Sequence, residues 1–386
     1  MRDMRGRDRS DRSERYWGEY SNLQRVKHDL IRHYLNGWFP KLGLGPRAGR
    51  ILYIDTHAGR GRHLTGELGS PLVALTAFLA HRSRDRILAR SEVVFIFIER
   101  DEANFAALQR EIAALGPVPD RVVIDPRSGD AFEVLRQTVL TLRRAGQGMA
   151  PAFIFVDPYG FEVPCSVLKD LLAFKGVELF VTLMWRELNM AIRQATKKAG
   201  MARAVDLVFD GPAWRDRIVG PRLEDRANQA LALLKEKVGA KWATDVRMRA
   251  KNRVTRYVLR HLTNSDDGRV LMKDVAWKLC PDGDFDACKA ASPDQQILPL
   301  EPDLTPLRYW VTKQLHGHPK RWQELVRLLV GEDWREPQLN AVIREMLGDT
   351  TILPSDYQGS RTPKANPLLS LAPRHSRSRA PGDAVR

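Results

Sequence analysis

The chain has 386 residues, of which 43% are hydrophobic and 28% are charged, values that are ordinary for a soluble globular protein of two domains. It contains no run of about 18 apolar residues that could cross a bilayer, and its N-terminus lacks the apolar centre of a signal peptide. Its cysteines, Cys165, Cys280 and Cys288, are odd in number and wrongly spaced for a zinc knuckle. We therefore expect a reduced, cytoplasmic protein without a metal site.

The formal net charge of +15 favours an anionic partner, and nucleic acid is the usual one. The alternative is a solvated basic surface with charged tails. Residues 361–386 hold six Lys and Arg residues against one acid, so part of the excess lies at this end. Charge by itself leaves both interpretations open.

Along the chain, residues 1–19 mix arginine with acid and are expected to be a disordered tail. Residues 23–38 carry apolar side chains at helical spacing. Five apolar segments then alternate with helical ones, which is typical of a parallel sheet whose two faces are covered by helices. The segments that supply these strands are 50–62, 93–100, 121–139, 152–160 and 177–184.

Residues 186–240 are predicted to be mainly helical, 241–250 and 253–263 alternate like strands, and 270–279 resemble a helix. The Pro/Asp-rich segment 281–302 is predicted to be a linker. Residues 20–290 are thus expected to form an α/β domain, a Rossmann-like sheet of the class I methyltransferase type with helices on both faces.

After the linker, three short helical segments precede residues 350–363, which could form a β-wing. This outline predicts a small winged helix-turn-helix-like domain over 303–360, followed by a basic disordered tail over 361–386. The small domain has seven Lys and Arg residues against eight acids. That balance is poor for a reader of DNA, so the domain could bind a protein instead.

Acidic residues follow four consecutive predicted strands: Asp55, Glu99, Asp130 and Asp157. The carboxyl ends of parallel strands line one crevice, where ligands bind. Asp55 opens the loop Asp-Thr-His-Ala58-Gly59-Arg-Gly61, whose glycines allow a ligand to approach the backbone. Glu99 is placed to bind a ribose diol, and Asp130 is placed to meet an adenine amino group. The alternative is that these acids cap helices, which for any single one is at least as plausible.

The loop does not match the other common nucleotide sites. A nicotinamide site would have a third glycine where Leu64 stands and an acid about 20 residues after the loop. No phosphate-binding loop of the Gly-x-x-x-x-Gly-Lys type is present. S-adenosylmethionine carries no phosphate and needs acids and a close backbone, so the sequence favours it as cofactor.

Asp157-Pro158-Tyr159-Gly160, after the fourth strand, suggests methyl transfer to an amine. Asp157 and the carbonyl of Pro158 could accept the amine protons, and Tyr159 or Phe161 could stack on a nucleobase. The alternative is a turn, for which Asp, Pro and Gly are ordinary residues.

A basic stretch accompanies the later strand pair and could follow a phosphate backbone, although a charged, solvated sheet edge is as plausible. Its candidate nucleic-acid contacts are Arg247, Arg249, Lys251, Arg253 and Arg256.

Taken together, the segments from KHDLIRHYL through YIDTHAGRGR, FIFIERDEANFAAL and FIFVDPYGFEVP to WREPQLNAVIREML resemble the three-Cys-motif partner protein family. The resemblance covers most of residues 20–355. It implies a Rossmann methyltransferase with a winged-helix domain that acts with a partner protein bearing three cysteines. GSPLVAL and the Asp-Pro motif also resemble bacterial rRNA adenine-N6 methyltransferases, from which Gly160 departs.

The sequence therefore predicts an S-adenosylmethionine-dependent methyltransferase that acts on DNA or RNA. One alternative is a non-catalytic scaffold that binds the cofactor or recruits a partner. Another is a methyltransferase with a protein or small-molecule substrate. The sequence does not indicate an oligomeric state.

Overall fold

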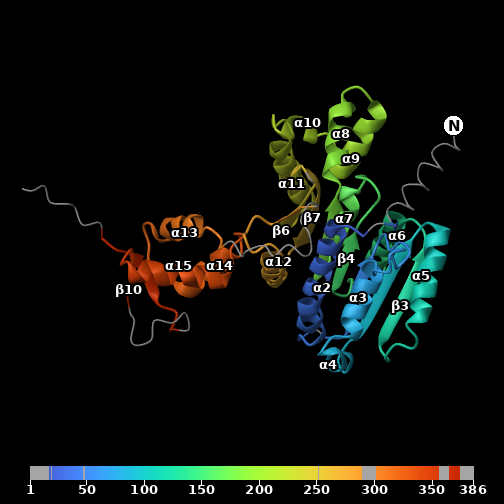
Figure 1. Ribbon diagram of the computed structural model, residues 1–386, viewed down its shortest axis with the longest axis horizontal. Coiled ribbons are helices and arrows are strands. Elements are labelled where there is room, and N and C mark those ends of the chain that lie inside the picture. The colour runs from blue at the N-terminus through green and yellow to red at the C-terminus, as the bar shows by residue number, and fades with distance from the viewer. Residues whose placement is uncertain are drawn as a thin grey trace, which may run out of the picture. The chain divides into compact units, whose positions relative to one another are not determined.

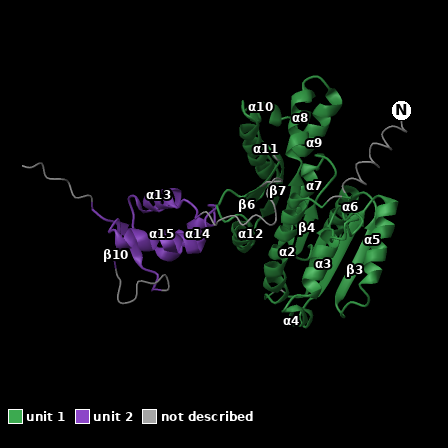
Figure 2. Ribbon diagram, in the orientation of Figure 1, with its two compact units in different colours: residues 1–300 green, residues 301–386 purple. Residues whose placement is uncertain are grey.

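The computed structural model describes residues 17–18, 20–46, 48–250, 252–288, 301–355 and 365–373. Figure 1 shows how the helices and strands of these residues are arranged. The chain divides into two compact units, residues 1–300 and 301–386, which Figure 2 distinguishes by colour. Each unit has a hydrophobic core of its own. The boundary falls inside the segment that the sequence predicts as a linker.

The first unit is built on one mixed sheet, whose described strands are β1 (Arg50–Asp55), β2 (Glu92–Glu99), β3 (Val122–Ser128), β4 (Ala152–Val156), β5 (Val177–Leu183), β6 (Trp242–Arg249), β7 (Thr255–Thr263) and β8 (Asp286–Cys288). Their order is β3-β2-β1-β4-β5-β7-β6-β8. Among these strands β7 alone runs against its neighbours, β5 and β6. This order confirms the predicted fold class, an α/β sheet of the Rossmann-like methyltransferase type.

Helices cover both faces of this sheet, as predicted. On one face α2 contacts α3, α4 and α12, and on the other α7 contacts α6, α9 and α11. No described helix is both long and apolar enough to cross a membrane. The helices of the unit are α2 (Asn22–Gly43), α3 (Ser70–Leu79), α4 (Arg84–Leu88), α5 (Glu102–Ala114), α6 (Ala131–Arg144), α7 (Cys165–Leu172), α8 (Trp185–Ala195), α9 (Ala199–Phe209), α10 (Trp214–Arg217), α11 (Leu223–Val238) and α12 (Asp266–Leu279).

The two faces of the sheet differ in the chemistry of their buried side chains, because alternate residues of a strand point to opposite faces. Aromatic side chains meet α2 and α3: Tyr53, Phe95, Phe97, Phe153, Phe155 and Phe180 lie with Phe39 and Phe78. Aliphatic side chains meet the other helix layer: Ile54, Ile98, Ile154, Val156, Leu179 and Val181 belong to its core. The aromatic face fixes α2, which carries residues of the site.

Two features of this unit differ from the sequence prediction. The first helix is longer than 23–38 and runs from Asn22 to Gly43. The predicted linker 281–302 contains β8, which pairs in parallel with β6 at the edge of the sheet. A strand of three residues leaves too short a pattern to be recognised among prolines and aspartates.

The second unit has α13 (Thr305–Leu315), β9 (Lys320–Arg321), α14 (Trp322–Leu329), α15 (Glu336–Gly348), β10 (Ile352–Ser355) and β11 (Leu368–Leu371). The three strands form a sheet of order β10-β11-β9, antiparallel throughout. The predicted tail over 361–386 is thus wrong for residues 365–373, since β11 supplies Leu369 to the core of this unit. The predicted wing residues 356–363 lie outside the described part, as do 361–364 and 374–386 of the expected tail and nearly all of 1–19.

Candidate active site

The carboxyl ends of β3, β2, β1 and β4 lie side by side, because these parallel strands are neighbours in that order. Asp55 ends β1, Glu99 ends β2, and Asp157 directly follows β4. Asp130 follows β3 and precedes α6. The structure therefore brings the four predicted acids to the edge at which open parallel sheets bind ligands.

The loop after β1 needs glycine at two positions. Gly59 and Gly61 have φ angles of +62° and +82°, in the left-handed region that other residues avoid. A Cβ atom on Gly59 would lie 2.3 Å from Cζ2 of Trp17, whose ring already fills that space. The amide of Ala58 donates to the carbonyl of Ile98 at 3.0 Å. In this structure the group that lies close to the backbone of Gly59 is therefore the side chain of Trp17.

Glu99 joins this loop to the end of β2. Its Oε2 accepts a hydrogen bond from the amide of Gly59, and its Oε1 accepts one from the amide of Asp101, each at 2.8 Å. Each oxygen of a carboxylate can accept a second hydrogen bond, so a hydroxyl donor could still be bound. Glu99 therefore orders the glycine loop and remains chemically suited to a ribose diol.

Asp55 lies beneath the loop and is fully buried. It accepts hydrogen bonds from the hydroxyl of Ser70 and, at 3.2 Å, from the amide of His57. Gly69 is the N-cap of α3, so Ser70, in the first turn of that helix, is available to contact Asp55. Burial raises the pKa of Asp55 to about 7, although the Ser70 hydrogen bond opposes this. Without an exposed surface, Asp55 can affect a ligand through its charge but not by contact.

Asp130 fits the alternative interpretation, in which the acidic side chain caps the following helix. It is the N-cap of α6, and its Oδ1 accepts from the amide of Glu133 at 3.1 Å. Asp101 caps α5 in the same way through the amide of Asn104. Asp130 is nevertheless exposed at the edge, so capping and contact with an adenine amino group are compatible.

Asp157 has a partner that the sequence analysis did not identify. Its Oδ2 forms a short ion pair with Nζ of Lys27 on α2. The Lys27 side chain is 6% exposed and that of Asp157 17% exposed. The ammonium also lies 5.8 Å from the ring centroid of Phe155. Lys27 stands four residues after Leu23 and four before Ile31, which places it on the apolar face of its helix. A lysine at such a position is unusual, and this is the sequence feature from which it could have been recognised.

The residues after Asp157 leave one aromatic ring accessible. Tyr159 is 60% exposed, whereas Phe161, the other predicted stacking residue, packs against the hydrophobic core. Gly160 has a φ of +107°, which favours glycine in this turn. Tyr159 is therefore the ring that a base could reach.

A second group that the sequence analysis missed surrounds the start of α2. The rings of Trp17 and Tyr20 lie 4.8 Å and 5.1 Å from that of His63, and the hydroxyl of Tyr20 is 3.0 Å from Nδ1 of His28. Burial and the neighbouring Lys27 hold the pKa of His28 well below its usual value. The four side chains pack the start of α2 against the glycine loop, and Trp17 is the member of the group that contacts Gly59 of the loop.

His57 packs within the loop. Its ring meets Phe132 edge-on at 5.6 Å, and its Nδ1 lies 2.7 Å from the hydroxyl of Thr56. Burial lowers the pKa of His57 to about 4. The imidazole is therefore neutral at physiological pH and adds no positive charge beside Asp157.

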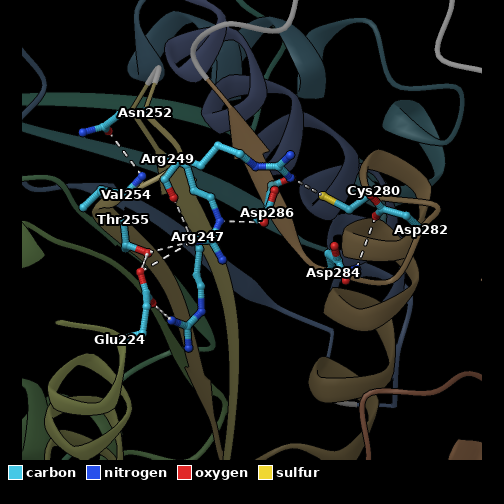
Figure 3. A network of polar contacts seen from close by, with 11 residues as sticks. Glu224, Arg247, Arg249, Asn252, Val254, Thr255, Cys280, Asp282, Asp284 and Asp286 are labelled. Carbon is cyan, nitrogen blue, oxygen red and sulfur yellow. Dashed lines mark hydrogen bonds and ion pairs between the residues drawn. The ribbon is translucent and has the colours of Figure 1, made fainter. Parts of the chain in front are cut away.

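Two of the arginines that are predicted to contact phosphate form ion pairs within the protein. Figure 3 shows Arg247 directed at Glu224 and Arg249 directed at Asp286, with N–O distances of 2.5 Å and 2.6 Å. Their side chains are each 21% exposed. Because their charges are matched within the fold, these two arginines bind β6 to α11 and β8. To follow a phosphate backbone, as the sequence predicts, both side chains would have to leave these ion pairs.

Arg253 and Arg256 are exposed near the hairpin between β6 and β7, so they remain candidates for phosphate contact. Lys251, the remaining candidate, lies outside the described residues. Cys165 and Cys280 are buried and free, and burial raises the pKa of each thiol to about 12. Neither is a nucleophile at neutral pH.

Comparisons with known proteins give weak similarities. No family model and no curated protein matches the chain. Among solved structures, it is similar to Trm1 from Pyrococcus horikoshii in complex with S-adenosyl-L-methionine, at 13% identity and a TM-score of 0.33 over 65% of this chain and 58% of that one. It is also similar to PKMT2 from Rickettsia typhi, at 12% identity and a TM-score of 0.25 over 56% of this chain and 37% of that one. The chain thus spans less than two thirds of the length of each of these proteins. The assignment of the fold class rests on the order of the strands.

Proposed function

We propose that this protein is an S-adenosylmethionine-dependent methyltransferase that acts on nucleic acid. The observation that carries the proposal is the carboxyl edge of the sheet. There a glycine loop ordered by Glu99 lies beside Asp157, and the exposed ring of Tyr159 follows two residues later. A ligand with a ribose diol and a positive charge but no phosphate would suit this combination of groups.

The residues present fit the cofactor. Glu99 would accept from the ribose hydroxyls, and Asp130 would meet the adenine edge. Burial raises the pKa of Asp55 to about 7, and a sulfonium cation bound nearby would favour its ionised form. Ala58 and Gly61 would line the loop as backbone. When bound, the cofactor supplies an activated methyl group.

For the substrate we infer an exocyclic amine of a nucleobase. Asp157 would accept a hydrogen bond from that amine and take the proton that the nitrogen loses. The carbonyl of Pro158 would accept the second amine hydrogen, and Tyr159 would stack on the base. Such an acceptor pair draws the nitrogen lone pair out of conjugation with the ring.

The net charge of +15 and the exposed Arg253 and Arg256 support a nucleic-acid substrate. The element order of the second unit, α13-β9-α14-α15-β10-β11, supports the proposal that it is a winged helix. Its slight excess of acids supports a protein as its ligand. We propose a three-Cys-motif protein for that role, on the family resemblance.

Cofactor binding by calorimetry tests the first half of this function. Glu99→Ala should weaken S-adenosylmethionine about 10- to 100-fold, because a charge-assisted hydrogen bond is worth about 1.5–3 kcal/mol. Glu102→Ala, an exposed acid in the first turn of α5, is the matched control and should not change affinity. A wild-type protein that binds no cofactor would contradict the assignment.

Mass spectrometry of total nucleic acid tests the second half. A methylated base should be present in cells with the intact gene and absent from cells without it. It should return with the wild-type gene but not with Asp157→Asn. Identical base compositions in the two strains, together with normal cofactor binding by the protein, would favour the scaffold alternative.

A further inference from the structure

Lys27 and Asp157 form an ion pair that uses only one of the two carboxylate oxygens of Asp157. Nζ of Lys27 binds Oδ2 of Asp157. In the described part of the chain, no group donates a hydrogen bond to the other oxygen, Oδ1. Because 17% of the Asp157 side chain is exposed, that oxygen can face a ligand while the lysine stays covered. The pair therefore presents a directed acceptor at the edge of the sheet.

The groups around this pair make the lysine electrostatically necessary. Asp55, at the end of the neighbouring strand β1, is fully buried and interacts with both Asp157 and Lys27. Tyr53, on the same strand, is a buried phenol whose pKa is well above its usual value, and His57 is neutral. Burial and, more weakly, the charge of Asp157 raise the pKa of Asp55, so a positive counter-charge beside the two acids reduces their repulsion. Lys27 on α2 supplies that counter-charge.

We propose that Lys27 is a positioning residue that holds Asp157 by Oδ2 and leaves its Oδ1 open, and that the pair selects a neutral aromatic amine as substrate. This inference rests on the proposed methyltransferase function. The ion pair restricts the Asp157 side chain, so that its second oxygen stays available to accept from the amine.

The same pair bears on the class of substrate. An alkylamine such as a lysine side chain is a cation at neutral pH, and its lone pair is occupied by a proton. The ammonium of Lys27 would repel it, and the charge of Asp157 is already matched. An exocyclic amine of a nucleobase is neutral and offers two hydrogens to Oδ1 and a neighbouring carbonyl. The site therefore favours the nucleobase over the protein side chain.

Thermal melts of the full-length protein test the pairing without any substrate. Lys27→Met leaves Asp157 without its counter-charge and should lower the melting temperature by about 5–10 °C. Adding Asp157→Asn should recover part of that loss, because no charge then remains unpaired. Lys41→Met, at an exposed position of the same helix, is the control and should change little. If the double variant melts below Lys27→Met, the charge pairing is wrong.

Methyl transfer then separates a positioning role from a structural one. The probes are S-adenosylmethionine with a tritiated methyl group and total RNA and DNA from cells that lack the gene. Lys27→Met should lower kcat about 10²-fold with an unchanged KM for the cofactor. Lys27→Arg keeps the charge and should retain most activity; if Lys27→Met does not fold, Lys27→Arg serves as the test, and a folded Lys27→Arg variant with a kcat as low as that of Asp157→Asn would overturn the inference.

The outcomes separate the two claims. If the wild type transfers no methyl group to either nucleic acid, the proposed function fails and this inference falls with it. If the wild type is active and Lys27→Met matches its kcat, only the inference is overturned. Faster transfer to the lysines of a denatured protein mixture than to nucleic acid would overturn the proposed selection of a neutral amine.

Discussion

At the scale of single residues, the site contains covered acidic side chains whose burial does not favour folding. Asp55 is fully buried and Asp157 is largely covered, and their charges interact. A buried carboxylate beside another is costly for folding, as its raised pKa indicates. Such a cost is expected where a cationic ligand is to be bound, since the ligand supplies the missing positive charge.

Asp55 should therefore make the stability of the protein depend on pH. Its pKa in the fold, about 7, lies above its usual value of 3.8. Between these pH values the folded state binds more protons than the unfolded state, so this contribution to stability is present in acid and is lost as pH rises towards 7. Asp55→Asn should melt higher than the wild type at pH 8, and this advantage should shrink at pH 5. Equal differences at both pH values would contradict the assignment.

At the scale of secondary-structure elements, α2 is held at its far end by a buried polar cluster. Glu178 on β5 accepts hydrogen bonds from the hydroxyl of Tyr34 (2.5 Å) and the indole of Trp38 (3.2 Å), and His261 lies 2.8 Å away. Burial pushes the pKa of Glu178 upward, but these partners outweigh it and hold the pKa below its usual value. The cluster connects α2 to the sheet and so supports Lys27, which lies about two helical turns before Tyr34.

Gly268 on α12 tests this packing. A Cβ atom there would lie 2.4 Å from Oε2 of Glu178, whose position is fixed by three partners. Alanine is favoured over glycine in helices by about 1 kcal/mol, so propensity predicts a more stable protein. We expect the clash to win and Gly268→Ala to lower the melting temperature. Gly200→Ala on α9, where only Nη2 of Arg203 lies within 4 Å (at 3.9 Å), is the control and should not lower it.

The arginines of the β6–β7 pair can be separated by salt dependence. Arg249 is matched by Asp286, whereas Arg256 is exposed. Arg256→Ala should reduce the slope of log affinity for nucleic acid against log salt by about one, the effect of one lost phosphate contact. Arg249→Ala should leave the slope unchanged and lower the melting temperature. Equal slopes for Arg256→Ala and the wild type would remove this surface from the nucleic-acid site.

The elements differ in how far their sequences specify them. The parallel strands and the helices between them could be predicted, because continuous apolar runs and 3.6-residue spacing are local signals. So could the four acids, which follow from where strands end. The strand β8 is too short for a pattern, and β11 lies beyond the expected wing. Lys27 and the packing of Trp17 on Gly59 depend on contacts between distant segments, which one sequence does not display.

At the scale of the whole molecule, the two units divide the proposed work. The first unit carries the carboxyl edge with Asp157 and Tyr159. The second unit has a core of its own, and residues 303–360 within it hold seven Lys and Arg residues against eight acids. The basic excess therefore lies in the first unit and in residues 361–386, which is consistent with a nucleic-acid substrate for the first unit and a protein ligand for the small unit.

The most direct test of this account is the single-turnover rate of methyl transfer to total nucleic acid by Asp157→Asn and the wild type. The substitution keeps the shape of the side chain and removes its charge. Melts and cofactor titrations must first show that the variant folds and binds S-adenosylmethionine. We predict that its rate falls about 10²- to 10⁴-fold, the usual contribution of a positioned proton acceptor. A folded, cofactor-bound variant that transfers the methyl group at the wild-type rate would contradict the account.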